Sequence, residues 1–326
     1  MYLLAFESSC DDTSVALLRD RELLSMHTHT QIEHIQTLGV VPEIAARLHA
    51  DYIFDLIDKV LQEGNIQLSD IDIFAATSEP GLVPSLLIGK TVAKSFAITH
   101  KKPLIWVNHI EGHIFSLLLE RDEADIIFPI VVLSASGGHN DLFLWKSLYE
   151  IVKIGSTLDD SAGESMDKVG RSLGLPFPAG RLMDELAQKY NPDIHRNIPS
   201  FPLVLPEWTL NFSFSGIKSA ALREIETRQK HNHLTETDKI EISYSYQKTI
   251  TTILSSRLIE AFRKTEAKSL ALVGWVSANS ELRKIMESFS AENDISYYTP
   301  LSLRYCWDNA AMIGMRAYWE WKLTCA

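Results

Sequence analysis

The sequence is poor in cysteine, in net positive charge and in long apolar runs. Its three cysteines, Cys10, Cys306 and Cys325, are too few and too widely spaced for a disulfide framework or a cysteine metal pair, so reduced thiols are expected. Lysine and arginine number 31 against 42 acidic residues, a net charge of −11. This balance disfavours a general nucleic-acid-binding protein, because phosphate contacts require basic residues. No apolar run reaches the roughly 18 residues that a membrane helix needs.

The N-terminal segment MYLLAFESSCDDTS lacks a basic stretch and soon becomes acidic. We therefore do not expect a secretory signal peptide. Together with the expected free thiols, this predicts a cytoplasmic protein with no membrane association. What the chain does contain is 46% hydrophobic and 22% charged residues over 326 positions. That composition is typical of a globular protein with room for about two domains.

Apolar periodicity predicts strands and helices that alternate along the chain. Short apolar runs predict strands at residues 2–7, 15–18, 71–77, 104–107, 130–133, 142–145 and 270–273. Helical spacing predicts helices at 43–62, 85–98, 161–173, 215–226 and 240–264, with others from about 111, after 279 and from about 309. The alternation predicts an α/β fold with mainly parallel sheets covered by helices. The proline-rich stretch 191–211 is expected to be a surface loop.

A pattern of strand, polar turn and strand begins the chain and recurs near residue 130. Such a recurrence indicates two related halves. The acidic stretch 120–125 lies between them and is the expected hinge.

The segment NHIEGH, residues 108–113, follows a predicted buried strand. His109 and His113 are four residues apart, which places them on one helix face about 5–6 Å apart at Cβ. Two neutral imidazoles so placed can bind one metal ion, although the same residues could equally cap the helix start. A zinc-protease motif is disfavoured, because it needs Glu directly after the first His and Ile110 stands there. A third ligand is usually a carboxylate. Asp308 is a candidate, but it could also be the N-cap of the last helix.

Two polar turns could bind an anion. The turn SASGGH at 134–139 has small residues that let backbone amides approach an anion closely. The turn SSCDDT at 8–13 could do the same with hydroxyls, while its carboxylates could hold a metal or a proton. Each turn alone is also consistent with an ordinary hairpin. Their occurrence in both halves favours a phosphate clamp between two lobes.

Two further segments combine helix-start signals with polar residues. In DDSAGESMDK, residues 159–168, Ser161 or Asp160 could be an N-cap. In VGWVSAN, residues 273–279, Asn279 could cap a helix or contact a ligand. The charges that follow the first cap also fit i, i+4 ion pairs, Glu164–Lys168 and Asp167–Arg171.

One family carries similar segments in the same order. From about residue 3 to 318, the chain resembles the bacterial tRNA N6-adenosine threonylcarbamoyltransferases, once described as glycoproteases and related to the archaeal and eukaryotic Kae1-type proteins. The segments are FESSCDDTSVAL, GVVPEIAARLHA, PGLVPSLLIGKTVAKSFA, NHIEGH, SASGGH, DDSAGESMDKVGRSLGL, FSFSGIKSAAL, VSAN and WDNAAMIG. The combination of NHIEGH with SGGH, AGESMDK and FSFSGIK is specific.

The resemblance implies a two-lobed α/β fold like that of actin, Hsp70 and the sugar kinases (the ASKHA fold), with two ribonuclease-H-like domains and a nucleotide cleft between them. It places the N-terminal lobe at residues 1–125, to which a C-terminal helix at about 308–326 returns, and the C-terminal lobe at 126–307. The implied reaction moves the threonylcarbamoyl group of threonylcarbamoyl-adenylate to N6 of the adenosine 3′ of the anticodon, position 37, in tRNAs reading ANN codons. AMP is released.

The resemblance also implies roles for particular residues. His109, His113 and Asp308 match the metal ligands, and Fe²⁺ is our first choice of ion with Zn²⁺ second, since two histidines and a carboxylate suit either. Asp11 is our candidate for handling the proton of the amine. The implied partners are tRNA, a non-catalytic paralogue (TsaB-type) and a small ATPase (TsaE-type). The implied substrate-binding positions are Ser134, Ala135, Ser136, Gly137, Gly138, Asp167, Gly180, Asp184 and Asn279.

The chain departs from the family pattern at four positions. Trp275 stands where a second glycine usually precedes VSAN, so its indole is expected to narrow the nucleotide pocket or to stack on the base. Trp307 replaces a small polar residue before Asp308, and Glu79 replaces a glycine. Ser134 stands where archaeal relatives carry a tyrosine that reaches the metal, so water or phosphate is the expected fourth ligand.

Two other functions remain open at this stage. A kinase or ATPase of the same fold would transfer or hydrolyse a γ-phosphate without partners, and it would leave NHIEGH unexplained. A non-catalytic scaffold, with its pocket blocked by Trp275, would bind partners but no nucleotide.

Overall fold

The computed structural model describes residues 1–37, 39–203, 209–231 and 233–325. The chain forms two compact units: unit 1 comprises Met1–Ile126 with Thr299–Ala326, and unit 2 comprises Ile127–Tyr298. The segment 299–307, expected in the C-terminal lobe, thus lies in unit 1. Within the described ranges no helix is long and apolar enough to cross a membrane.

Unit 1 is built on a five-stranded sheet of order β3-β2-β1-β4-β5. Strands β1, β2 and β3 pair antiparallel, whereas β4 runs parallel to β1 and β5 runs parallel to β4. The strands are β1 (Tyr2–Glu7), β2 (Asp12–Arg19), β3 (Glu22–Thr30), β4 (Ile73–Glu79) and β5 (Leu104–Asn108). The α-helices of the unit are α1 (His34–Thr37), α2 (Pro42–Gly64), α3 (Val83–His100), α4 (His109–Phe115) and α10 (Ala310–Cys325). Short 3-10 turns are η1 (Leu68–Asp70), η2 (Ser116–Leu118), η3 (Glu123–Asp125) and η5 (Leu303–Tyr305).

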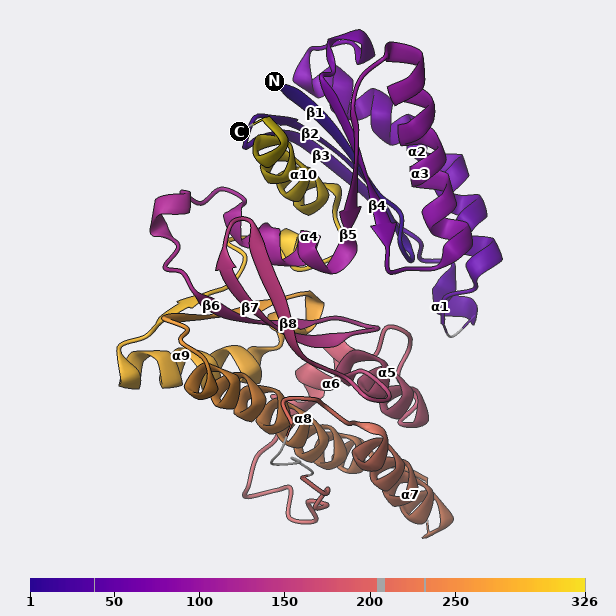
Figure 1. Cartoon of the computed structure of the whole chain (residues 1–326). Helices are drawn as coiled ribbons and strands as arrows, with labels where there is room; N and C mark the ends of the chain where they lie inside the picture. The colour runs from indigo at the N-terminus through magenta and orange to yellow at the C-terminus, as the bar shows by residue number, and fades with distance from the viewer. Residues whose placement is uncertain (38, 204–208, 232, 326) are drawn as a thin grey trace. The chain divides into compact units, whose positions relative to one another are not determined.

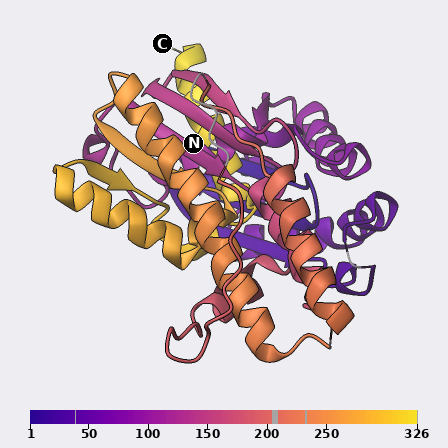
Figure 2. The ribbon, with the colours of Figure 1, turned by 90° about the horizontal axis from the view of Figure 1, so that it is seen from below.

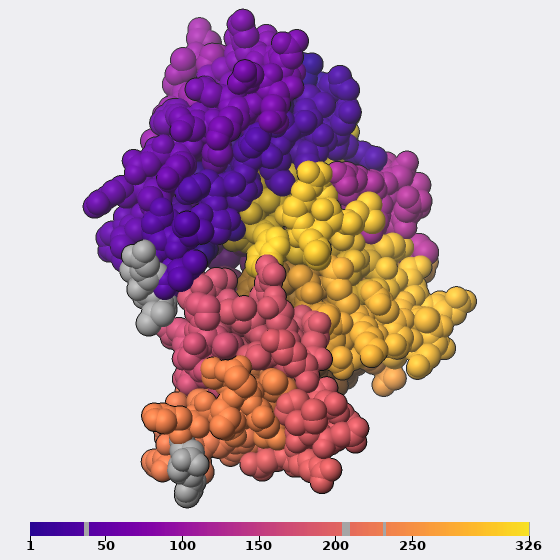
Figure 3. All heavy atoms as spheres, turned by 180° about the vertical axis from the view of Figure 1, so that it is seen from behind, coloured from indigo at the N-terminus to yellow at the C-terminus, as the bar shows by residue number. Residues whose placement is uncertain are grey.

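Consecutive residues of β1 point to opposite faces of the sheet and are apolar on both. Helices therefore cover both faces and bury these side chains. Leu4 and Phe6 join a buried core with residues of α2 and α3. Ala5 and Leu18 face α10: a Cβ added at Gly314 would meet Leu18 at 2.4 Å and Ala5 at 3.4 Å. Helices α2 and α3 accordingly lie on one side of the sheet and α10 on the other (Figure 1). Figure 3 shows the yellow C-terminal residues directly beside the indigo N-terminal ones.

Unit 2 repeats the sheet of unit 1. Its five-stranded order is β10-β9-β6-β7-β8, with β6, β7 and β8 antiparallel and with β9 and β10 added in parallel. The same order and directions in both sheets confirm the recurrence predicted from the sequence. The strands are β6 (Ile130–Ala135), β7 (Asn140–Ser147), β8 (Glu150–Ser156), β9 (Ser269–Val273) and β10 (Ser296–Tyr298). The helices are α5 (Ala162–Ser172), α6 (Gly180–Ala187), α7 (Ser215–His231), α8 (Glu236–Lys264), the 3-10 turn η4 (Trp275–Ala278) and α9 (Ser280–Asn293).

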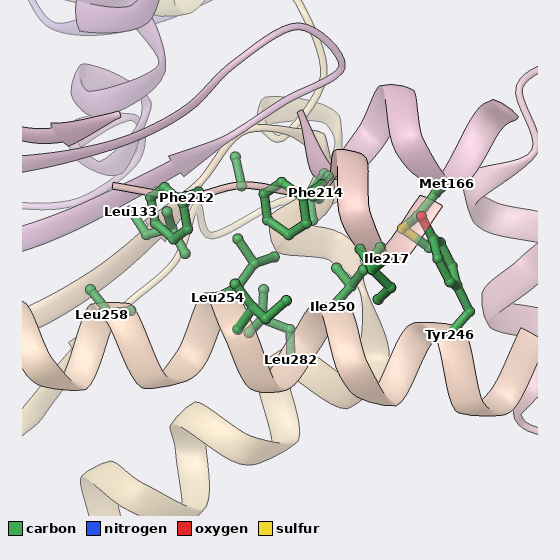
Figure 4. Packing of buried hydrophobic residues seen from close by; sticks show 14 of the residues in the cluster. Leu133, Met166, Phe212, Phe214, Ile217, Tyr246, Ile250, Leu254, Leu258 and Leu282 are labelled. Atoms are coloured by element: carbon green, nitrogen blue, oxygen red, sulfur yellow. The ribbon is translucent and has the colours of Figure 1, made fainter. Parts of the chain in front are cut away.

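The core of unit 2 gathers around α8, the longest helix. Ile250, Leu254 and Leu258 recur every four residues and therefore share one helix face, which points toward Phe212 and Phe214 (Figure 4). Helix α7 lies beside α8 (Figure 2). This core holds the two segments that carry SASGGH and DDSAGESMDK.

The prediction of mainly parallel sheets is wrong, because each sheet contains two antiparallel pairs. The strands that sequence reasoning missed, β3, β8 and β10, lie at sheet edges and each contain a single buried residue, so their apolar pattern is weak. Helix α4 begins at His109 rather than near 111, because Asn108 caps it. In the expected loop at 191–211, the described residues form no helix or strand, and 204–208 lie outside the described ranges.

Candidate metal centre and glycine-lined site

The end of β5 places two histidines on one short helix. Asn108 Oδ1 accepts hydrogen bonds from the backbone N–H of Ile110 at 2.9 Å and of Glu111 at 3.3 Å, which starts α4 directly after the strand. His109 and His113 then follow one helical turn apart, with ring centroids separated by 4.7 Å. Both side chains are buried, so neither ring is free to turn into solvent.

Asp308 meets these two rings from the segment before α10. Its Oδ1 lies 3.4 Å from His109 Nε2 and 3.1 Å from His113 Nε2. One ligand atom from each of the three residues lies within 4.8 Å of the others, an arrangement that could hold a metal ion. The N-cap role suggested for Asp308 is wrong, because the Oδ1 of Asn309 accepts from the Met312 N–H at 2.9 Å. The Asp308 carboxylate is therefore left to face the histidines.

Glu7, at the end of β1, completes the surroundings of His109, and sequence reasoning missed it. Its Oε2 accepts a hydrogen bond from His109 Nδ1 at 3.0 Å, and its Oε1 accepts one from the Ser9 N–H at 2.6 Å. A proton held on Nδ1 leaves Nε2 free as a metal ligand. The only signal in the sequence was a carboxylate at the end of an apolar strand.

The charges at this centre shift one another's pKa values. Burial by itself would raise the pKa of Glu7 and of Asp308, but the attraction of His109 holds the pKa of each carboxyl below its usual range. Burial would lower the pKa of His109, yet the two carboxylates raise it well above its usual range. Two carboxylates converging on one imidazole favour positive charge at this site, so the site suits a cation.

Asp11 follows β1 in the turn SSCDDT. Burial and then the negative charge of Asp308 raise the pKa of its carboxyl. Its backbone carbonyl accepts from the Gln31 N–H at 3.0 Å, which ties the turn to the residue after β3. The side chain thus lies in the electrostatic field of a proposed metal ligand.

In unit 2, the small-residue turn is docked on the N-terminus of α5. The Gly137 carbonyl accepts from the Glu164 N–H at 3.1 Å and from the Ser161 hydroxyl. Ser161 also accepts from the Glu164 N–H at 3.1 Å, so it is the N-cap that the sequence predicted. Ser134 and Ala135 lie within β6 and are buried, so the turn itself is confined to residues 136–139.

The other expected substrate-binding residues all take part in hydrogen bonds within unit 2. Asp167 Oδ1 accepts from the Gly180 N–H at 3.1 Å, and Asp184 Oδ1 accepts from the Ser280 hydroxyl at 2.9 Å. Asn279, next to Ser280, caps α9 by accepting from the Leu282 N–H at 3.0 Å, as one of its two predicted roles required. Of the predicted ion pairs, Glu164–Lys168 is present at 2.6 Å.

The indole of Trp275 lies against three glycines, which we call the glycine-lined site: Gly137, Gly163 and Gly180. Two of them are expected substrate-binding positions, whereas Gly163 was not singled out from the sequence. The structure therefore brings Gly137, Asp167 and Gly180 into one place in unit 2 and adds an aromatic ring there.

The known proteins most useful for comparison fall into two groups. Among solved structures, the T. kodakarensis HypF covers 98% of this chain with a TM-score of 0.64 at 11% identity, and the chain covers 48% of it. Component A of Acidaminococcus fermentans (R)-2-hydroxyglutaryl-CoA dehydratase has a TM-score of 0.56 at 14% identity, with 98% of both chains covered. At these identities the similarity establishes the fold alone, a two-lobed α/β fold of the actin type.

Sequence relatives are much closer. The tRNA N6-adenosine threonylcarbamoyltransferase of Bacillus subtilis is 40% identical over 318 residues, which cover 96% of this chain and 89% of that protein. The Mycoplasma capricolum enzyme of the same name is 37% identical over 319 residues, which cover 98% of this chain and 97% of that protein. The family model for tRNA N6-adenosine threonylcarbamoyltransferase matches residues 22–315. The chain is therefore a transferase that belongs to the tRNA N6-adenosine threonylcarbamoyltransferase family.

Proposed function

We propose that this chain transfers the threonylcarbamoyl group of threonylcarbamoyl-adenylate to N6 of adenosine 37, 3′ of the anticodon, in tRNAs reading ANN codons, with release of AMP. The observation that carries the proposal is the convergence of His109, His113 and Asp308 within a chain that matches the family along its length. A kinase or ATPase function would leave that ligand set unexplained.

The donor atoms fit one divalent ion held by His109, His113 and Asp308. Fe²⁺ is the first candidate and Zn²⁺ the second, because two imidazoles and a carboxylate suit both. When bound, the ion would supply Lewis-acid stabilisation to the phosphate or the carbonyl oxygen of the substrate. Glu7 supports this assignment, because it fixes the proton of His109 on Nδ1.

The chain's own residues would bind and orient the adenylate. Gly137 and Gly138 offer backbone that an anion can approach closely, and Ser134, Ala135 and Ser136 lead into this turn. Asp167 and Asp184 would hold the ribose hydroxyls or neighbouring polar groups, with Gly180 and Asn279 beside them. Positioning of this kind is the main requirement, because the mixed anhydride already has a good leaving group.

In the transfer step, the N6 lone pair forms a bond to the carbamoyl carbon. The bond from that carbon to the phosphate oxygen breaks, and its electron pair leaves with AMP. The amine loses one proton, for which Asp11 is the proposed acceptor. The raised pKa of its carboxyl supports this role, since a more basic carboxylate accepts a proton more readily.

We also assign the chain to the cytoplasm, with tRNA, a non-catalytic paralogue (TsaB-type) and a small ATPase (TsaE-type) as partners. The net charge of −11 supports a need for partners in tRNA binding, because an acidic chain attracts little nucleic acid by itself.

Incorporation of labelled threonine into an unmodified ANN-reading tRNA tests the proposal. With ATP, bicarbonate, the partner proteins and the enzyme that makes the adenylate, we expect label in tRNA that carries adenosine 37 and none in the same tRNA with guanosine there. Phosphate transfer or ATP hydrolysis by the purified chain alone would instead support a kinase or ATPase. Partner binding with no nucleotide affinity would support a scaffold.

Metal analysis tests the proposed ligands separately. We expect about one ion per chain in the wild type. We expect at least a tenfold loss in His109→Ala, which removes a ligand, and in Asp308→Asn, which replaces a charged oxygen ligand with a neutral one. Equal metal in all three proteins would rule the site out.

A further inference from the structure

The indole of Trp275 fills the space in front of the three glycines of the glycine-lined site. An ideal Cβ at Gly163 would lie 2.6 Å from the indole Cζ2, and one at Gly180 would lie 2.7 Å from Cη2. One at Gly137 would lie 3.2 Å from Nε1. Because these distances are shorter than ordinary carbon contacts, the ring lies directly against glycine backbone and leaves no room for a ligand between them.

The backbone before the ring is constrained. Gly274 has a φ of +81°, and a Cβ there would meet the Ala135 carbonyl oxygen at 2.4 Å. Both facts restrict position 274 to glycine. Glycine at this position lets the start of η4 lie close to the end of β6. From there the side chain of Trp275 reaches the turn after β6, the first turn of α5 and the start of α6.

Hydrogen bonds hold the backbone around the ring, and the ring itself borders solvent on one side. Gly137 accepts from the Glu164 N–H, and the Gly180 N–H donates to Asp167, so both glycines are held to α5. Trp275 is only half-buried, and its side chain therefore borders solvent. Because the two glycines are held to α5, a ligand can reach them only if the Trp275 side chain turns away from them toward solvent.

We propose that Trp275 acts as a gate, in which its indole occupies the glycine-lined site and must swing out before an adenylate can contact Gly137 and Gly180. This rests on the proposed function, which assigns the adenylate to these residues. The apparent dissociation constant for the nucleotide is then the intrinsic one divided by the fraction of molecules in which the gate is open. An open fraction of about one tenth would weaken nucleotide binding about tenfold.

Calorimetric titration of the full-length protein with AMP tests the gate. Trp275→Gly removes the indole, and we expect it to bind AMP about tenfold more tightly than the wild type. Trp275→Phe keeps an aromatic ring and is expected to stay within about threefold of the wild type. Thermal unfolding shows whether the variants are folded. Equal or weaker binding by a folded Trp275→Gly would overturn the gate, and weaker binding would indicate a ring that stacks on the base.

Fluorescence provides a readout on the native protein. The signal of Trp275 is the difference between the wild type and Trp275→Phe, since the chain has seven tryptophans. Saturation with AMP should shift this difference spectrum to the red, because the indole leaves a packed site for water. Quenching without a red shift, or no change, would contradict the gate.

The two proposals fail in different ways. If neither the wild type nor Trp275→Gly binds AMP, the adenylate is wrongly assigned to this site and both proposals fall. If the wild type binds AMP and transfers threonine while Trp275→Gly binds no better, only the gate is wrong.

Discussion

At the residue scale, the most informative side chain is Glu7. It is fully buried, and its two oxygens accept hydrogen bonds from Ser9, Thr77 and His109. A buried carboxylate with this many donors is held in one orientation. It therefore fixes both the ring plane and the tautomer of His109, although it does not itself belong to the group that could hold the ion.

Glu7→Gln is expected to weaken metal binding by about 10–100-fold, because the second-sphere partner no longer takes the Nδ1 proton as a charged acceptor. Metal-competition titration measures this. Glu63→Gln is the matched control, since Glu63 also pairs with a histidine, His27, but is exposed, and its hydrogen bonds are to Ser25 and His27 and not to a proposed metal ligand. Equal effects of the two substitutions would show that Glu7 has no special role.

Asp160 is a second residue whose charge has consequences. It accepts hydrogen bonds from Lys168 at 2.8 Å and from Lys218, and so it connects α5 to α7. Burial raises the pKa of its carboxyl, but the hydrogen bonds of the two lysines outweigh this and leave the pKa below its usual range. A lowered folded-state pKa stabilises the fold above the unfolded value of about 3.9, and this stability is lost as the pH falls through the folded value.

Asp160→Asn should therefore lower the free energy of unfolding by about 2 kcal/mol at pH 7, the scale of charge-assisted hydrogen bonds. The difference from the wild type should shrink as the pH falls below about 4, where the carboxyl of the unfolded state takes up a proton, and it should disappear below the lower pKa of the folded state. Urea unfolding at pH 7 and at pH 3 measures both values. A difference that is the same at the two pH values would show that the loss is steric and not electrostatic.

At the scale of elements, the candidate metal centre depends on how closely α4 approaches α10. A Cβ added at Gly112 of α4 would meet Ile313 Cδ1 at 2.9 Å and Met312 Cγ at 3.3 Å. Glycine at 112 thus lets the two helices come together. This approach is what carries Asp308, two residues before α10, to the rings of His109 and His113.

Gly112→Val should push α4 from α10 and weaken metal binding at least tenfold, because a metal site needs its ligands within a few tenths of an ångström. Metal titration and thermal unfolding should be measured together. Gly216→Ala in α7 is the control: a Cβ there meets nothing within 4 Å, so metal affinity should not change. Unchanged metal affinity in a folded Gly112→Val would mean that helix spacing does not set the site.

At the scale of the whole molecule, each unit has a core of its own, and all the proposed metal ligands belong to unit 1. An ion that binds only the native state stabilises it by about 2.7 kcal/mol at 100 times its dissociation constant. That stabilisation should be local if the two cores open independently.

Hydrogen exchange with and without Zn²⁺ tests this. We expect slower exchange in α4, in β1 and at the start of α10, and little change in α8, which belongs to the other core. His109→Ala should abolish the protection, which identifies the site responsible. Equal protection in α4 and α8 would show that the two units open as one.

The sequence by itself determined the local features of this protein. The period of apolar residues predicted most strands and helices, and the spacing of His109 and His113 put them on one helix, because both depend only on neighbours in the chain. Small polar residues predicted the caps Ser161 and Asn279 for the same reason. The repeated strand pattern and the family motifs were likewise legible without coordinates.

Only the tertiary structure decided which distant residues meet. Asp308 is 195 positions from His113, and nothing local distinguished it from other aspartates. Glu7 and the ring of Trp275 acquire their roles from the packing of strands, helices and glycines that lie far apart in the sequence. Side-chain periodicity shows which face is buried, but the partner across that face is set by the packing of the folded chain.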